Sequence, residues 1–236
     1  MQIWNAFLLV SITTLSAQAQ RIPASDRLGD NLPLARQYLD EARQLCGHDQ
    51  GRLWGRPFCQ PIMLVDRKTR FVVTCETDSQ GQLRNQGGVF VGQLPLDINI
   101  WNTSQTWAGK KWAQVMWPVP KDPSARREVF LHEQFHLVQA ELGIQSKNPQ
   151  NPQLDQLDGR YLMQLELRAL RRALSATSYP EQLEAMGDAL LFRKRRWQEF
   201  SSAEDEETAL ELFEGTAAYT GVKLEPRGRL HRISMQ

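Results

Sequence analysis

His132-Glu133-Gln134-Phe135-His136 is the stretch of this chain on which the interpretation of its fold depends. On an α-helix, residues four apart lie on the same face, so His132 and His136 can turn their ring nitrogens toward one point. Glu133 directly follows the first histidine. Two imidazoles with a neighbouring carboxylate form the arrangement that a catalytic zinc ion needs, namely two ligands and a general base for a water molecule. The alternative is a surface helix that matches this spacing by chance.

The residues around the motif predict one helix from Asp122 to Gly143. Asp122 is a suitable N-cap, Pro123 fits the first turn, and Gly143 is a typical stop signal. Apolar residues occupy both sides of this helix, which predicts burial between a sheet and a second helical layer. Buried ionisable groups are costly unless they are paired or bound to a metal, so the burial favours a function for the motif. The apolar positions are Leu131, Phe135, Val138 and Leu142 on one stripe, and Val129 and Ala140 on the stripe of the histidines.

The segment before the motif is rich in β-forming residues. Pro61–Asp66 and Arg70–Glu76 are apolar, β-branched runs separated by Arg67-Lys68-Thr69, which predicts a hairpin. A helix is expected before them, from Asn31 to Cys46, where apolar residues recur at helical spacing. The further strands expected from the sequence are Val89–Val91, Leu96–Ile100 and Trp112–Trp117, with turns at Gly87-Gly88 and Ala108-Gly109-Lys110.

The segment after the motif is helical. A polar loop from Lys147 to Asp158 precedes three predicted helices, Arg160–Ala176, Pro180–Phe200 and Ala203–Val222. The sequence therefore predicts an α+β fold in which a small mixed or antiparallel sheet (50–120) is followed by a helical layer (122–223). We expect a single domain over residues 21–236.

Two glutamates of the helical part compete to be the third metal ligand. Glu214 lies on the apolar stripe that contains Phe213, Ala217 and Gly221, and Glu166 lies on a similar stripe. Periodicity alone does not choose between them.

A resemblance favours Glu214. The segment Leu212-Phe213-Glu214-Gly215-Thr216-Ala217-Ala218-Tyr219 resembles the Glu-Gly-x-Ala-x-Tyr helix of gluzincin metallopeptidases, especially their aminopeptidase-like branch. This resemblance implies a zincin-like fold in which His132, His136 and Glu214 hold Zn²⁺ and Glu133 is the general base. It also implies hydrolysis of peptide bonds in a peptide or protein substrate.

The sequence departs from that family in two respects. A helical hairpin separates the two motifs and brings Glu166, which is either an alternative ligand, a carboxylate that holds a histidine, or part of a buried salt bridge. The family also supplies an oxyanion donor beyond the glutamate helix, whereas Tyr219 points away from the metal on an ideal helix and His231 is the only later histidine. The chain ends soon afterwards, which suggests a missing C-terminal subdomain. The alternative function is therefore a zincin-like scaffold with weak or no activity that acts as a binding protein.

The N-terminal residues 1–20 read as a signal peptide, with an apolar run followed by Ala17-Gln18-Ala19, so we expect an exported protein, secreted or periplasmic. The apolar run is too short and too interrupted for a stable membrane span. In an oxidising compartment Cys46 and Cys59 are a candidate disulfide, although pairing of Cys75 with either is equally open.

The formal net charge of +1 argues against a nucleic-acid partner. The strand Trp112–Trp117 is either a sheet edge that receives a peptide or a simple core strand. Neither the cleavage specificity nor the oligomeric state follows from the sequence.

Overall fold

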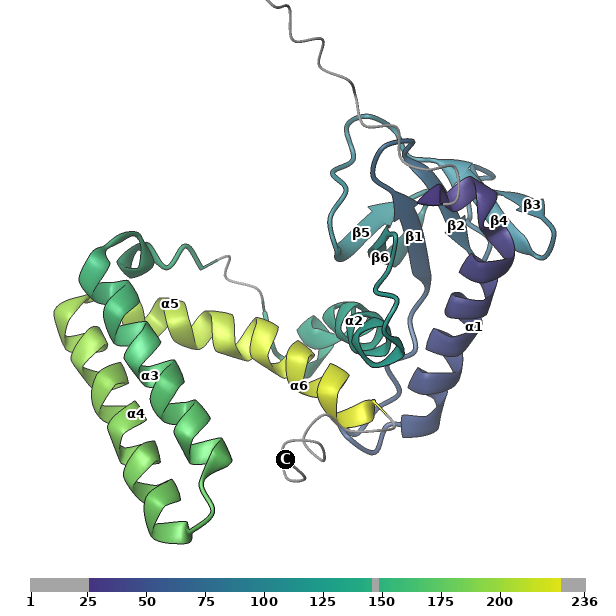
Figure 1. Ribbon diagram of the computed structural model, residues 1–236. Coiled ribbons are helices and arrows are strands. Elements are labelled where there is room, and N and C mark those ends of the chain that lie inside the picture. The colour runs from purple at the N-terminus through teal and green to yellow at the C-terminus, as the bar shows by residue number, and fades with distance from the viewer. Residues whose placement is uncertain (1–25, 146–148, 226–236) are drawn as a thin grey trace, which may run out of the picture.

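The computed structural model describes residues 26–145 and 149–225. The predicted signal peptide, residues 1–20, and His231 lie outside the described residues. Figure 1 shows a β-sheet with helices packed beside it, and a helical hairpin that extends away from the sheet. The fold is α+β, as the sequence predicts.

The helices keep the predicted order, but the one helix predicted over Ala203–Val222 is divided into α5, a π turn and α6, and α2 ends earlier than expected. They are α1 (Leu32–Asp49), α2 (Pro123–His136), α3 (Leu157–Ser175), α4 (Tyr179–Glu199), α5 (Ala203–Leu210) and α6 (Thr216–Leu224). Short 3₁₀ turns are η2 (Leu28–Asp30), η3 (Gln139–Leu142) and η4 (Pro152–Asp155), and η5 (Glu211–Gly215) is a π-helical turn.

Six strands form one mixed sheet in the order β3-β4-β2-β1-β6-β5. Neighbouring strands are antiparallel except β1 and β6, which are parallel. The predicted hairpin between the first two strands is confirmed, because β1 and β2 pair antiparallel across the turn that contains Arg67-Lys68-Thr69. The strands are β1 (Ile62–Asp66), β2 (Phe71–Thr74), β3 (Arg84–Gln86), β4 (Val89–Gln93), β5 (Thr103–Trp107) and β6 (Lys110–Trp117).

One strand prediction is wrong. Leu96–Ile100 is a loop, because side chains of the sheet bind its carbonyl groups: Gln114 Nε2 donates to Asn99 O at 3.0 Å and Arg70 Nη2 donates to Ile98 O. The strand expected over Trp112–Trp117 is present, and of its two readings the core strand is confirmed, since β6 lies between β1 and β5. The edge beside it is β5.

Both faces of the sheet are covered by apolar side chains. Ile62 and Leu64 of β1 face the cluster formed with α1 and α2, while Met63 and Val65 face a second cluster around Trp112. This alternation is the period-two geometry of a strand. A third cluster joins α1, α2 and α6, and the helix with the His132–His136 motif contributes Leu131 and Phe135 to it.

The Cys46–Cys59 disulfide is present, which leaves Cys75 as a free thiol whose pKa is raised by burial. The bond closes a loop that lies against the motif helix. Gln134 Nε2 donates to Gln60 O at 2.7 Å in that loop. Trp54 of the same loop stacks on Phe135, with ring centroids 4.9 Å apart. The loop therefore holds the buried side of α2 in place.

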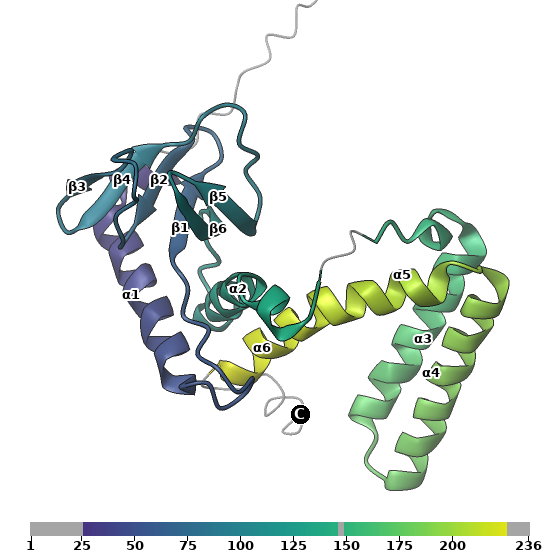
Figure 2. The same cartoon turned by 180° about the vertical axis from the view of Figure 1, so that it is seen from behind.

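The helical hairpin of α3 and α4 is attached to α5 at its open end, as Figure 2 shows from behind. The attachment is a buried ion cluster. Arg196 is fully buried and donates to Glu166 and to Glu207, each at 2.6 Å. Burial alone would raise the pKa of Glu207, but hydrogen bonds from Arg196, Trp197 and Gln153 outweigh it and hold that pKa below its ordinary value.

In the described part of the chain, no helix combines the length and apolarity that crossing a bilayer requires.

Candidate metal centre

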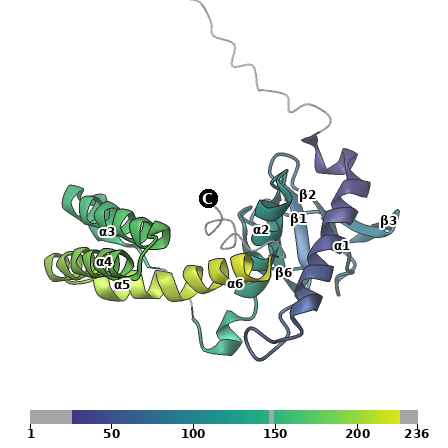
Figure 3. The ribbon, with the colours of Figure 1, turned by 60° about the horizontal axis from the view of Figure 1, so that its bottom comes forward.

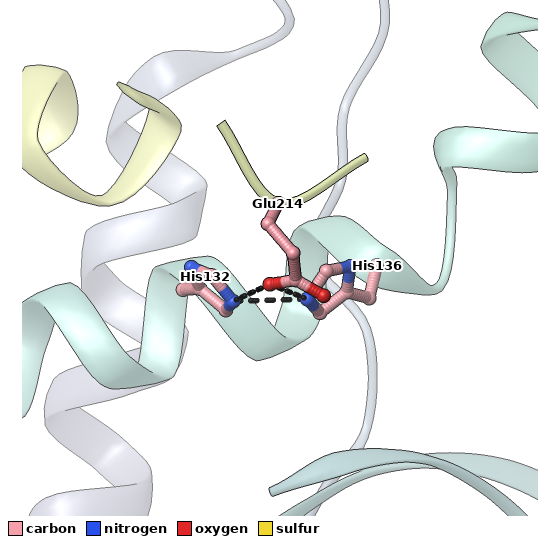
Figure 4. A group of neighbouring side chains, drawn as sticks. All are labelled: His132, His136 and Glu214. Atoms are coloured by element: carbon pink, nitrogen blue, oxygen red, sulfur yellow. Dashed lines mark hydrogen bonds and ion pairs between the residues drawn. The ribbon is translucent and has the colours of Figure 1, made fainter. Parts of the chain in front are cut away.

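Three side chains from two helical segments meet at one point, as Figure 4 shows. His132 Nε2 and His136 Nε2 are 2.9 Å apart. Glu214 Oε2 lies 3.3 Å from the first nitrogen and 3.5 Å from the second. The structure therefore brings together the two histidines of the motif and the glutamate that the resemblance favours.

The separations of these atoms fit one divalent cation. Zinc bonds to nitrogen and oxygen are about 2.0–2.2 Å long, so adjacent ligand atoms of a tetrahedral site lie about 3.3 Å apart. The three observed separations lie on either side of that value. Two imidazoles and one carboxylate also match the donor set of catalytic zinc, whereas calcium and magnesium prefer oxygen ligands alone.

The helix α2 supplies both histidines, and its end differs from the prediction. The sequence predicts a helix that continues to Gly143, but α2 ends at His136. Beyond His136 the backbone hydrogen bonds join residues three apart, which is the 3₁₀ pattern: Leu137 N donates to Gln134 O and Val138 N donates to Phe135 O. This change of pitch brings Gln139 beneath His136.

Gln139 orients the second histidine. Its Oε1 lies 2.6 Å from His136 Nδ1, and its Nε2 donates to the Thr216 hydroxyl at 3.0 Å. Because the amide nitrogen is used as a donor, the amide oxygen is free to accept the Nδ1 proton of the imidazole. His136 Nε2 then carries the lone pair that faces Glu214. A ligand histidine held in this way is the usual arrangement in metal sites.

Glu214 is presented by the π-helical turn η5, which lies between α5 and α6. Single π turns in helices occur frequently at functional sites. Its position depends on a close contact between α6 and α2. Ala217 is fully buried, and a Cβ atom on Gly221 would lie 2.8 Å from the carbonyl oxygen of Glu128. Small residues at these two positions are what allow the carboxylate to reach the histidines.

Glu133 lies beside the cluster in an apolar setting. It is buried, and its Oε2 makes no hydrogen bond within the described residues. Burial raises the pKa of Glu133 to about 8, and the negative charge of Glu214 adds to the rise. Burial also lowers the pKa of His132, with a further contribution from His136. A neutral imidazole is the form that binds a metal.

Glu166, the other candidate carboxylate, does not belong to this site. It accepts hydrogen bonds from Arg193 at 2.7 Å and from Arg196 at 2.6 Å, inside the cluster that holds the hairpin to α5. Both carboxylate oxygens of Glu166 accept hydrogen bonds from arginines of α4. Glu166 is therefore neither a ligand candidate nor a residue that holds a histidine. The role expected for a second carboxylate is filled by Gln139, which the sequence analysis missed.

Tyr219, which is expected to point away from the cluster, packs edge-on against Trp54, with ring centroids 6.4 Å apart. His231 lies outside the described residues.

An open groove of about 470 Å³ runs beside the cluster. His132 and Glu133 form one wall, and the rest is mostly apolar. The other lining residues are Pro120, Ala125, Glu128 and Val129 before the motif, and Ala218 and Val222 on α6.

Comparison of the chain with protein-family models, with curated proteins and with solved structures finds no match.

Proposed function

We propose that this protein is a zinc-dependent peptidase of the gluzincin type with a zincin-like fold. The observation that supports the proposal best is the convergence of His132, His136 and Glu214 within one ion's coordination distance. A buried carboxylate beside such a cluster, with one oxygen free of hydrogen bonds in the described chain, is a second support.

In this proposal His132, His136 and Glu214 hold Zn²⁺. The ion, when bound, would polarise the scissile carbonyl and make a water molecule more acidic. Glu133 takes a proton from the attacking water and passes it to the leaving nitrogen, so the carboxyl acts first as base and then as acid. Gln139 keeps the imidazole of His136 in the tautomer that leaves Nε2 free.

The groove and the sheet edge suggest how a peptide would lie. The apolar wall formed by Val129, Ala218 and Val222 suits an apolar side chain next to the cleaved bond. The edge strand β5 contacts α2 and pairs, among the described strands, only with β6. An extended substrate can add to such an edge as another strand.

The test is zinc content and peptide hydrolysis measured on the same preparations. We expect the wild type to bind about one equivalent of zinc and to cleave members of a mixed peptide library. Glu133→Gln should keep the zinc and lose activity by roughly 10²–10⁴-fold, the usual contribution of a general base. Glu128→Gln is the matched control, because Glu128 lies on the same helix and lines the same groove but is not one of the residues assigned to the ion or to the base.

Two outcomes would overturn the proposal. Turnover that is unchanged in Glu133→Gln would exclude this carboxylate as the base. Stoichiometric zinc with no turnover of any peptide would favour the alternative expected from the sequence, a scaffold that binds a partner.

A further inference from the structure

The hairpin of α3 and α4 presents two faces of opposite character. Its seam is formed by alanines: Ala169 and Ala173 of α3 and Ala185 and Ala189 of α4 are all buried. Alanines bury little apolar area, so this seam alone contributes little stability. The large apolar side chains of the hairpin lie outside the seam.

One face carries the charges. The residues directly before the seam alanines are Arg168 and Arg172 on α3, and Glu184 and Asp188 on α4. Arg172 forms ion pairs with Glu184 at 3.1 Å and with Asp188 at 3.4 Å. This face is an ordinary solvated surface with cross-helix ion pairs.

The other face carries apolar side chains in a regular pattern. The residues directly after the seam alanines are Leu170 and Leu174 on α3 and Met186 and Leu190 on α4. Because the two helices are antiparallel, side chains that follow the seam on each helix point to the same side of the hairpin. The complete stripes have identical i, i+4, i+7, i+11 spacing: Met163, Leu167, Leu170 and Leu174 on α3, and Tyr179, Leu183, Met186 and Leu190 on α4.

Only the open end of this apolar face is covered. Trp197, two turns beyond the last residue of the α4 stripe, donates to Glu207 of α5 at 2.8 Å, so α5 packs on this side of the hairpin. Figure 3 shows α5 running from the open end to α6 while the two long helices extend beyond it. Seven side chains of the two stripes remain exposed by 37% to 70%. They amount to roughly 700 Å² of apolar surface, which exceeds what monomeric soluble proteins usually expose.

We propose that this face packs against the same face of a second copy of the chain and forms a four-helix bundle. Two such faces would bury roughly 1,400 Å², within the range of stable protein interfaces. The spacing of the stripes is the pattern of bundle core positions. Both stripes are free of charged side chains, and Arg193, which follows the α4 stripe, is engaged by Glu166 and Glu211. This neutrality favours a neutral apolar partner over an anionic lipid surface.

The test is sedimentation equilibrium of the full-length protein and of two matched variants. Leu190 and Leu191 are adjacent and equally exposed, at 65% and 66%, but only Leu190 belongs to the stripe. We expect a wild-type dimer at about 50 µM protein, a concentration that populates ordinary interfaces of this size. Leu190→Glu should raise the dimer Kd by roughly 100-fold or more, because each interface loses two buried leucines. Leu191→Glu should leave it unchanged.

Far-ultraviolet circular dichroism checks that both variants keep the wild-type helix content. A wild type that stays monomeric at that concentration overturns the proposal, and so does an equal loss of dimer in the two variants. A monomer that binds phosphatidylcholine–phosphatidylglycerol vesicles through this face, with binding lost in Leu190→Glu, would show that a membrane is the partner instead. The outcome does not depend on hydrolysis, since neither variant touches the metal centre.

Discussion

The sequence pattern alone gives Glu214 and Glu166 the same standing as a third ligand, whereas the structure gives them different partners. Replacing each of them is therefore the sharpest test of the candidate site. Both are glutamates on apolar stripes of helices, but one faces two imidazoles and the other faces two guanidinium groups. Glu214→Ala should therefore change metal binding and leave the fold intact. Glu166→Ala should change stability and leave metal binding intact.

The expected magnitudes follow from the surroundings of each carboxylate. Loss of an outer partner of a ligand already lowers metal affinity about 10–100-fold, so removal of the ligand Glu214 should cost more than roughly 100-fold. Its side chain is about half exposed, so the metal-free protein should lose less than about 1 kcal/mol of unfolding free energy. Loss of Glu166 leaves the fully buried Arg196 with one carboxylate instead of two. Breaking a buried pair costs about 3–5 kcal/mol, which lowers the unfolding temperature by roughly 6–20 °C.

The assays are zinc titration with a competing chelator and thermal unfolding of the metal-free protein. Glu211→Gln is the matched control, because Glu211 is on the same π turn as Glu214, is similarly exposed, and pairs with Arg193 instead of the histidines. The ligand assignment would be refuted if Glu166→Ala removed the zinc while Glu214→Ala retained it. It would also fail if Glu211→Gln weakened zinc binding as much as Glu214→Ala.

Three further predictions concern the supports of the site and of the hairpin. Gln139→Ala should lower zinc affinity about 10–100-fold, because the Nδ1 hydrogen bond of His136 is lost; unchanged affinity in a chelator titration would contradict this role. Gly221→Val should weaken zinc binding and lower the unfolding temperature, because a Cβ there lies 2.8 Å from a backbone oxygen of α2; wild-type values in both measurements would refute the close approach. The folded-state pKa of Glu207 is depressed below 4.5, so its contribution to stability is present above that pH and is lost as the pH falls through the folded pKa. Chemical unfolding across this range should show a smaller acid loss in Glu207→Gln than in the wild type.

The sequence predicted the part of the site that depends on spacing within one helix. The i, i+4 spacing of His132 and His136 fixes which face of the helix holds them, whatever surrounds it. The apolar stripe around Glu214 likewise indicates that its carboxylate points inward. The same reasoning made Glu166 an equally good candidate for the third ligand, because periodicity indicates the direction of a side chain and not the residues that it contacts. Arg196, which decides the matter, is on another helix and thirty residues away in the chain.

The predictions that failed depend on contacts between distant segments. The early end of α2 places Gln139 under His136, and no residue between them is a helix breaker. Strand order has the same origin: β6 becomes an inner strand only because β1, far earlier in the chain, pairs with it in parallel. A stretch such as Leu96–Ile100 has strand-like composition, but its carbonyl groups accept hydrogen bonds from side chains of the sheet.

A long insertion separates the histidine motif from Glu214 in the chain. The three candidate ligand residues can still meet precisely, because Glu214 is held in position from its C-terminal side. The segment α5–η5–α6 is held at its end by Arg127, which pairs with Glu225 at 3.2 Å and with Glu41 of α1 at 2.6 Å. Between that anchor and Glu214, the contact of Gly221 with α2 fixes the distance between the helices. The hairpin is attached on the other side of Glu214, through Arg196 to Glu207 and through Arg193 to Glu211. Motion of the hairpin, or binding of a partner to it, therefore acts on the N-terminal side of Glu214, whereas both anchors lie on its C-terminal side. The positions of the three candidate ligand atoms are set by the contacts of α6 with α1 and α2.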